Sequence, residues 1–139
     1  MMSQGDVPPQ VGRQQLDAVL QFLPVFERPD YQVGEWRYPE GRFPYYACSS
    51  EVDDFVGALF KAGMIFPFDW PSWQEEAECY YTDPHVLETA GILTLRKLLI
   101  THVRKDRFAE GHLGSMLERG HITAILRRLK AIREKTGER

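Results

Sequence analysis

Residues 94–129, TLRKLLITHVRKDRFAEGHLGSMLERGHITAILRRL, decide the fold. Within them Leu95, Leu98 and Leu99 lie three and four residues apart, the spacing of one helical face. The same spacing recurs near the end of the chain, at Ile122, Ile125, Leu126, Leu129 and Ile132. Gly111 and Gly120 separate the segments. We therefore expect a long helix within residues 86–108, which Gly91 can divide, then a short helix and a basic final helix.

Helical patterns also precede this stretch. One runs from Gly12 to Phe26, and Pro24 should bend or end it near Leu23 because proline removes a backbone donor. A second begins at Ser50, a suitable N-cap, and stops at Gly63.

Two further start signals follow. Ser72 with Glu75 three residues later has the form of a capping box. Asp83-Pro84 suits an N-cap followed by the first helical residue.

The segment between the first two helices lacks a helical period. Val33–Tyr38 and Arg42–Ala47 are rich in aromatic residues and flank Pro39-Glu40-Gly41. That triplet suits a type I turn with proline at its second position and glycine at its fourth. We expect a short β-hairpin whose second strand, because of Pro44, lies at an edge.

These elements predict a mostly α-helical fold. We expect a single compact domain at residues 11–135, with about six helices and the small hairpin. Residues 1–10 should form a loose tail, and residues 136–139 should fray.

Composition excludes several classes of protein. The 139 residues are 43% hydrophobic and 27% charged, values typical of a globular domain. No run of about 20 apolar residues indicates a transmembrane helix, and residues 1–6 do not resemble a signal peptide. Two cysteines are too few for a disulfide scaffold or a thiolate zinc site.

Charge is distributed unevenly along the chain. Residues 1–93 hold 5 Lys and Arg against 15 Asp and Glu, whereas residues 94–139 hold 12 against 5. One interpretation is that the basic helices pack beside the acidic part. The alternative is a helix-turn-helix across Gly120, with Thr123, Arg127 and Lys130 facing a DNA groove and Arg128 or Arg133 facing a phosphate.

The densest polar segment is Arg104–His112. Arg104 and Arg107, with His112 at the start of the next helix, form a candidate anion-binding site. The structural alternative is that Asp106 ties down one of the arginines and fixes the helix junction.

A metal site is the weaker interpretation of the same region. The possible ligands are His102, Asp106, Glu110, His112 and His121. His102 and Asp106 share a helix face, but the set is not a His-Glu-x-x-His motif. We therefore assign no metal ligands and no cofactor.

Motifs for nucleophilic or nucleotide chemistry are missing. The sequence has no Gly-x-Ser-x-Gly elbow, no phosphate loop and no dinucleotide-binding fingerprint. Cys48 and Cys79 are interpreted as small buried hydrophobic residues. We assign no catalytic residue and do not expect an enzyme.

Aromatic residues are concentrated early: 16 of the 17 lie between Phe22 and Tyr81. We expect Phe55, Phe60, Trp70 and Trp73 to lie in the core, since each buries a large area. Trp36, Tyr45 and Tyr46, near an edge strand, are the better interface candidates.

Two stretches together resemble the bacterial domain-of-unknown-function family DUF6508. One is Asp69-Trp70-Pro71-Ser72-Trp73, following Phe55–Ile65. The other comprises Thr94–Leu99, Arg104–Leu113 with its Arg-x-x-Arg-Phe-x-x-Gly element, Gly120–Ile122 and Leu126–Leu129. The resemblance covers about residues 30–133 and implies a small cytoplasmic bacterial protein, without an activity or substrate.

We expect a non-enzymatic protein-interaction module, with a protein partner or self-association through the hairpin or the aromatic surface, and no membrane association. The alternatives are a DNA-binding protein that uses the final helix, and an anion-binding or enzymatic pocket around Arg104, Arg107 and His112.

Overall fold

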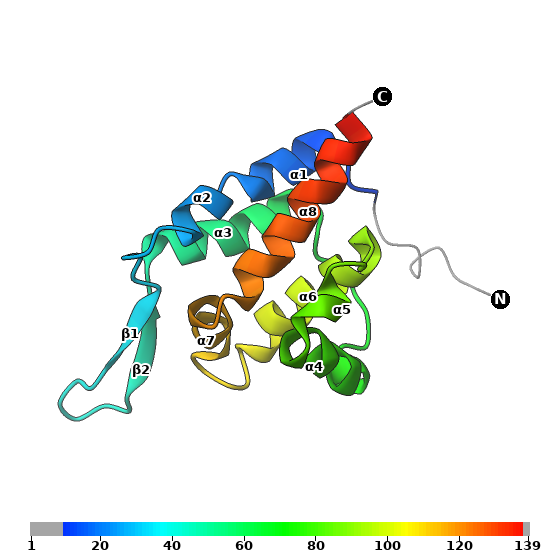
Figure 1. The fold of residues 1–139 in the computed structure, drawn as a ribbon. Helices are drawn as coiled ribbons and strands as arrows, with labels where there is room; N and C mark the ends of the chain where they lie inside the picture. The colour runs from blue at the N-terminus through cyan, green and yellow to red at the C-terminus, as the bar shows by residue number, and fades with distance from the viewer. Residues whose placement is uncertain (1–9, 138–139) are drawn as a thin grey trace.

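The computed structural model describes residues 10–137 and is mostly α-helical with one small hairpin, as expected (Figure 1). Its elements, in order, are α1 (Arg13–Leu20), α2 (Leu23–Phe26), β1 (Gly34–Arg37), β2 (Tyr45–Cys48), α3 (Ser50–Lys61), η2 (Pro71–Trp73), α4 (Gln74–Thr82), α5 (Pro84–Leu87), α6 (Ile92–Lys105), α7 (His112–Glu118) and α8 (His121–Gly137). Apart from the four-residue α2 and α5, the α-helices match the expected six. Of the expected loose tail, only Gln10 lies within the described residues, and α8 includes Thr136 and Gly137.

Helix α8 is the central element of the fold. It packs against α1, α2, α5, α6 and α7, and Figure 1 shows it crossing between the N-terminal helices and the α4–α6 group. Its apolar stripe is fully buried at Ile122, Ile125, Leu126 and Leu129. The buried stripe of α6, Leu95, Leu98 and Leu99, joins the same core. The stripes that decide the fold in the sequence therefore form its interior.

Several expected helix boundaries are confirmed. Helix α1 ends at Leu20, near the expected point, and Pro24 is the second residue of α2. The Asp83 side chain accepts a hydrogen bond from the backbone N–H of His85 at 3.1 Å, capping α5. Gly91 is the N-cap of α6, and Gly63, with a φ of +76°, follows the end of α3. Left-handed backbone at this position favours glycine over residues with a Cβ atom.

Three local expectations were wrong. The hairpin turn lies one residue later than expected: Arg42 N–H donates to the Pro39 carbonyl, and Gly41, at the third position, has a φ of +73°. A type II turn requires such a φ there. Ser49, rather than Ser50, is the N-cap residue of α3. The Ser72–Glu75 capping box does not form, because Ser72 Oγ donates to Asp69 Oδ2 at 2.6 Å and α4 starts only at Gln74.

Arg96 is buried, although the helical pattern placed it away from the core. Its Nε donates to the Met64 carbonyl at 3.1 Å and its Nη2 to the Gly63 carbonyl at 2.8 Å. Its guanidinium carbon lies 4.7 Å from the centre of the Phe66 ring. One side chain thus satisfies two backbone carbonyls after α3 and fixes the following loop against α6.

The aromatic core differs from the expected one. Phe55 is fully buried and contacts the rings of Phe22 and Phe26. Trp70 and Trp73 are half-buried, and Phe60 is 43% exposed, so its placement in the core was wrong. The buried face of α3 is formed by Val52, Phe55 and Leu59, and Phe60 lies beside it at the surface, with the guanidinium carbon of Arg104 5.5 Å from its ring centre. Within residues 10–137 no helix has the length and apolar character needed to cross a bilayer.

Candidate functional site

The hairpin projects from the helical body and is fixed to it by Tyr46. Strands β1 and β2 form the hairpin at the edge of the molecule (Figure 1). They are antiparallel, with Glu35 opposite Ala47 and Trp36 opposite Tyr46. The Tyr46 ring lies so close to Gly114 of α7 that a Cβ atom at that glycine would be 2.7 Å from it. Tyr46 also donates from its hydroxyl to Glu118 Oε1 at 3.1 Å and from its backbone N–H to Glu110 Oε2 at 2.7 Å.

These contacts correct one interface candidate. Tyr46 joins the hairpin to the body and is half-buried, so its ring is not free for a partner. Burial, together with the hydrogen bond to the Glu118 carboxylate, raises the pKa of Tyr46 to about 12.

The outer edge of β1 is unpaired. Because the Tyr46 N–H points to Glu110, away from β1, Trp36 and Tyr46 form a non-hydrogen-bonded pair. The N–H and C=O groups of Trp36, and by the same alternation those of Gly34, then point away from β2. Among residues 10–137 these groups have no hydrogen-bond partner. An edge of this kind can accept another strand.

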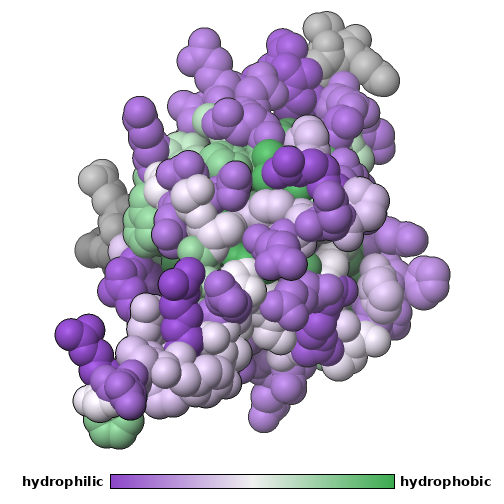
Figure 2. Space-filling view, turned by 90° about the vertical axis from the view of Figure 1, so that its left-hand side faces the viewer, coloured by the Kyte–Doolittle hydropathy of each residue, from purple (hydrophilic) through white to green (hydrophobic). Residues whose placement is uncertain are grey.

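Several aromatic side chains of the hairpin and its turn are exposed. Trp36 and Tyr45 are each 44% exposed, Tyr38 is 75% exposed and Phe43 is 92% exposed. Figure 2 views the molecule from the side of the hairpin, and hydrophilic residues cover most of that face. Large exposed aromatics on a mostly polar face are the side chains that most often dominate protein–protein binding energy. Trp36 and Tyr45 are therefore partly exposed, although the Trp36 ring also lies against the body, where a Cβ atom at Gly111 would be 3.1 Å from it.

The three residues of the candidate anion site lie in different surroundings. Arg104 stacks over Phe60. Arg107 lines a hollow of about 210 Å³ together with Cys48, Asp53 and Phe60, and neither Arg104 nor His112 lines it. The His112 ring packs on the ring of His102.

Asp106 binds neither arginine. Its Oδ1 accepts from the backbone N–H of Leu113 at 2.9 Å, at the start of α7. The structural alternative predicted that Asp106 fixes the helix junction by binding an arginine. Asp106 does fix the junction, but its partner is the backbone N–H of Leu113.

Three of the five residues that the sequence analysis grouped as possible metal ligands, His102, His112 and His121, converge where α6, α7 and α8 meet. His102 Nδ1 lies 3.0 Å from His112 Nε2, and the ring centres of His102 and His121 are 5.0 Å apart. Tyr81 of α4 covers the group, 5.3 Å from His121 between ring centres. The Nε2 atoms of His102 and His121 are buried and have no hydrogen-bond partner. In the sequence, His112 directly follows Gly111 and His121 directly follows Gly120, so each stands at the start of a helix. That shared position was the available signal for their convergence.

Burial keeps this histidine cluster neutral. It lowers the pKa of His102 to about 2, with a smaller effect of the neighbouring His121 and His112. Burial, with a smaller effect of Arg119, lowers the pKa of His121 to about 4, and burial also lowers that of His112. In the neutral state, these three side chains add no positive charge to the junction of α6, α7 and α8. Among residues 10–137, no three His, Cys, Asp or Glu side chains are arranged to hold a metal ion.

The two cysteines differ in exposure, and the thiol of Cys48 is not activated. Both are unpaired: Cys48 is half-buried and Cys79 is exposed, so the expected burial of Cys79 was wrong. Burial raises the pKa of the Cys48 thiol to about 11, with a smaller effect of Asp106. Because the thiolate is the nucleophile, such a thiol reacts poorly at neutral pH.

The basic side chains of α8 mostly contact the rest of the chain. Arg127 Nε donates to Glu27 Oε2 at 2.8 Å, and Arg133 binds both carboxylate oxygens of Asp17. Arg128 Nε donates to the Ala90 carbonyl at 2.9 Å. Thr123, which the helix-turn-helix alternative places in a DNA groove, is buried. The arrangement matches the other interpretation, in which the basic helix packs beside the acidic part.

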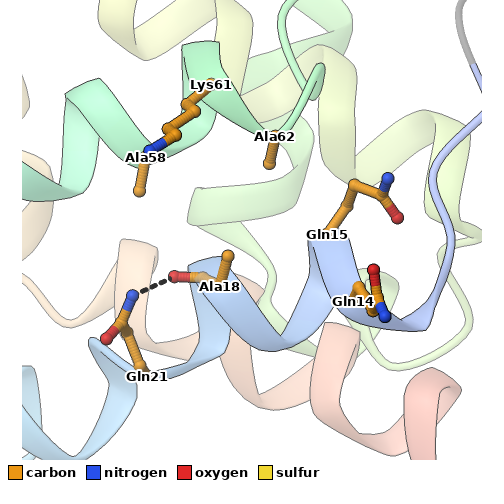
Figure 3. Close-up of a pocket in the computed structure, with 7 residues that line it drawn as sticks. All are labelled: Gln14, Gln15, Ala18, Gln21, Ala58, Lys61 and Ala62. Atoms are coloured by element: carbon orange, nitrogen blue, oxygen red, sulfur yellow. Dashed lines mark hydrogen bonds between the residues drawn. The ribbon is translucent and has the colours of Figure 1, made fainter.

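Another hollow, of about 310 Å³, lies between α1 and α3 (Figure 3). Alanine side chains from the two helices line it, Lys61 is its only charged lining residue, and Gln21 Nε2 donates to the Ala18 carbonyl beside it. Its other lining residues are glutamines and alanines, so no second charged group lies beside Lys61 in this lining.

A family model described as a family of unknown function, DUF6508, matches residues 11–135. The chain belongs to DUF6508. The resemblance found in the sequence is therefore correct, and this DUF6508 chain is matched over nearly its whole length. No curated protein and no solved structure matches it.

Proposed function

We propose that the protein is a non-enzymatic interaction module that binds another polypeptide along the outer edge of β1. The observation that supports this function is the unpaired N–H and C=O groups of Gly34 and Trp36 on a projecting hairpin. A strand that adds to such an edge gains affinity from main-chain hydrogen bonds and specificity from alternate side chains.

The attachment of the hairpin supports this role. Tyr46 holds β2 on α7 through its ring, its hydroxyl and its backbone N–H, so β1 is presented in one orientation. A preorganised edge loses less conformational entropy on binding than a loose loop. The neighbouring Trp36, Tyr38 and Tyr45 supply apolar area for the contact.

We further propose that the protein acts in the cytoplasm of bacteria, as the family resemblance implies. The unpaired thiols of Cys48 and Cys79 suit a reducing compartment.

Site-specific photo-crosslinking in cells of the natural host tests the proposal. A benzophenone amino acid replaces Tyr38 beside the β1 edge, and in a matched control it replaces Leu93, which is 42% exposed on the first turn of α6. We expect a crosslinked polypeptide, either a second copy or another protein, from position 38 and not from position 93. Equal crosslinking at both positions, or none at position 38, would overturn the proposed function.

A further inference from the structure

We propose that a second copy of this chain occupies the β1 edge. In this dimer the two β1 strands run antiparallel about a two-fold axis at Trp36, giving a four-stranded sheet in the order β2-β1-β1-β2. The inference rests on the proposed function, because it uses the same edge, and it names the partner. Its support comes from backbone alternation, charge and exposure.

Backbone alternation restricts the register. The outward N–H and C=O groups belong to Gly34 and Trp36. When two β1 strands pair in antiparallel orientation, residues whose N–H and C=O groups point outward must lie opposite one another. A shift of one residue would place them opposite residues whose groups point toward β2, and the inter-strand hydrogen bonds would be lost. With the axis at Trp36, each copy exchanges two hydrogen bonds with Trp36 of the partner subunit. Gly34 then faces Tyr38 of the partner subunit.

Charge selects among the remaining registers. Glu35 and Arg37 flank Trp36 on the opposite face of the strand, and they are mostly exposed, with an intrachain N–O distance of 3.6 Å. The axis at Trp36 places Glu35 opposite Arg37 of the partner subunit, twice. A shift of two residues in one direction places Glu35 opposite the partner's Glu35, and in the other direction Arg37 opposite the partner's Arg37. Because like charges directly opposite each other destabilise a sheet, only one register is self-complementary.

Exposure provides contact area at the axis. Trp36 is 44% exposed even though its ring packs edge-on against Tyr46, 5.5 Å away between ring centres. Antiparallel pairing brings Trp36 beside Trp36 of the partner subunit on the same face of the sheet, and aromatic cross-strand pairs stabilise such sheets. A four-residue edge is short, so the dimer belongs with small interfaces that dissociate on dilution.

Sedimentation velocity of the full chain over a hundred-fold concentration range tests the proposal. We expect the wild type to shift from monomer to dimer as concentration rises. Glu35→Arg and Arg37→Glu each create two like-charged pairs, and each should weaken dimerisation about ten-fold or more. Glu40→Arg, in the exposed turn, makes the same charge change as Glu35→Arg. It is the matched control for that variant and should dimerise like the wild type.

The decisive sample is an equimolar mixture of Glu35→Arg and Arg37→Glu chains. Each opposed pair then again contains one acid and one base, so the mixture should form a mixed dimer although neither variant dimerises well alone. A wild type that stays monomeric, or single variants that dimerise like the wild type, would overturn the proposal. If the wild type stays monomeric while position 38 still crosslinks to another protein, the proposed function survives and only this partner is wrong.

Discussion

Arg96 shows how one buried side chain can organise a loop. Its guanidinium reaches the Gly63 and Met64 carbonyls, which follow the last turn of α3. Burial lowers its pKa from the usual arginine range, but a guanidinium remains protonated at neutral pH. The charged donor therefore stays available to both carbonyls.

Replacing this arginine should destabilise the fold. Arg96→Met keeps much of the side-chain length but removes the donors, leaving two carbonyls unsatisfied, and should cost about 2–4 kcal/mol. Urea unfolding measures the loss. Arg107→Met, at an exposed position, is the matched control and should change stability by less than about 0.5 kcal/mol. Equal stability of the two variants would refute the structural role of Arg96.

The buried histidines make stability depend on pH. In the unfolded chain each histidine has a pKa near 6.5, whereas in the folded protein the pKa of His121 is about 4 and that of His102 about 2. Below pH 6.5 the unfolded state therefore binds protons that the folded state does not. Stability is full above pH 6.5 and falls as pH decreases toward 4.

Replacing His121 should flatten this dependence. By pH 5 the wild type should have lost about 2 kcal/mol at His121 alone, relative to pH 8. His121→Gln should show a smaller loss between these pH values, even if it is less stable at both. His85→Gln, whose side chain is 85% exposed, should keep the wild-type slope. The same pH slope in all three proteins would show that His121 is not held neutral.

At this scale the sequence predicts apolar burial better than polar burial. The stripes at Leu95, Leu98, Ile122 and Ile125 were expected in the core and lie there. The burial of Arg96 was not expected. Helical spacing predicts the direction in which a side chain leaves the helix, whereas the burial of Arg96 depends on a hydrogen bond to the Met64 carbonyl, 32 residues away in the chain.

Among the elements, the hairpin is held on the helical body by a few contacts, and the closest of them involves Gly114. Gly114 of α7 leaves the space that the Tyr46 ring occupies, and Tyr46 in turn connects β2 to Glu118. The orientation of the β1 edge is therefore set by a glycine in a helix 68 residues away in the chain.

A methyl group at this glycine should displace the hairpin. Gly114→Ala puts a Cβ atom 2.7 Å from the Tyr46 ring, so the ring must move, at a cost of about 1–3 kcal/mol. Gly57→Ala in α3, where a Cβ atom meets nothing within 4 Å, should instead stabilise the protein by up to about 1 kcal/mol. Thermal unfolding compares them, and stabilisation by both would contradict the described docking.

Sequence signals located elements well where they were local. Pro24, Asp83 and Gly91 marked real boundaries because each acts on the backbone beside it. The capping box failed because Ser72 found a closer acceptor in Asp69. Such competition between neighbouring side chains is decided by geometry that spacing alone does not give.

At the scale of the whole molecule, the acidic residues 1–93 and the basic residues 94–139 provide opposite charges that pair within the fold. Arg127 and Arg133 of α8 bind Glu27 and Asp17 near the start of the chain, so segments about 100 residues apart are joined by opposite charge. Lys130 of the same helix stays exposed.

We therefore expect that α8 does not bind DNA. An electrophoretic mobility shift with duplex DNA at low salt should show no complex at micromolar protein, because the paired arginines are not available to phosphates. A salt-sensitive complex that Arg127→Ala and Lys130→Ala both weaken would contradict this expectation.

Convergence between distant elements was the part that the sequence could not predict. His102, His112 and His121 were named together only as possible metal ligands, and it is the packing of α6, α7 and α8 that brings the rings of His112 and His121 to within about 5 Å of the His102 ring. Conversely, of Arg104, Arg107 and His112, which are neighbours in sequence, only Arg107 lines the hollow beside Cys48 and Phe60.

Amide hydrogen exchange at Trp36 tests the association of the β1 edge most directly. Its N–H points away from β2, whereas that of Glu35 points toward β2 and is protected within the hairpin. As protein concentration rises into the range where dimers form, exchange at Trp36 should slow markedly while exchange at Glu35 changes little. Fast exchange at Trp36 at every concentration would contradict the proposed association.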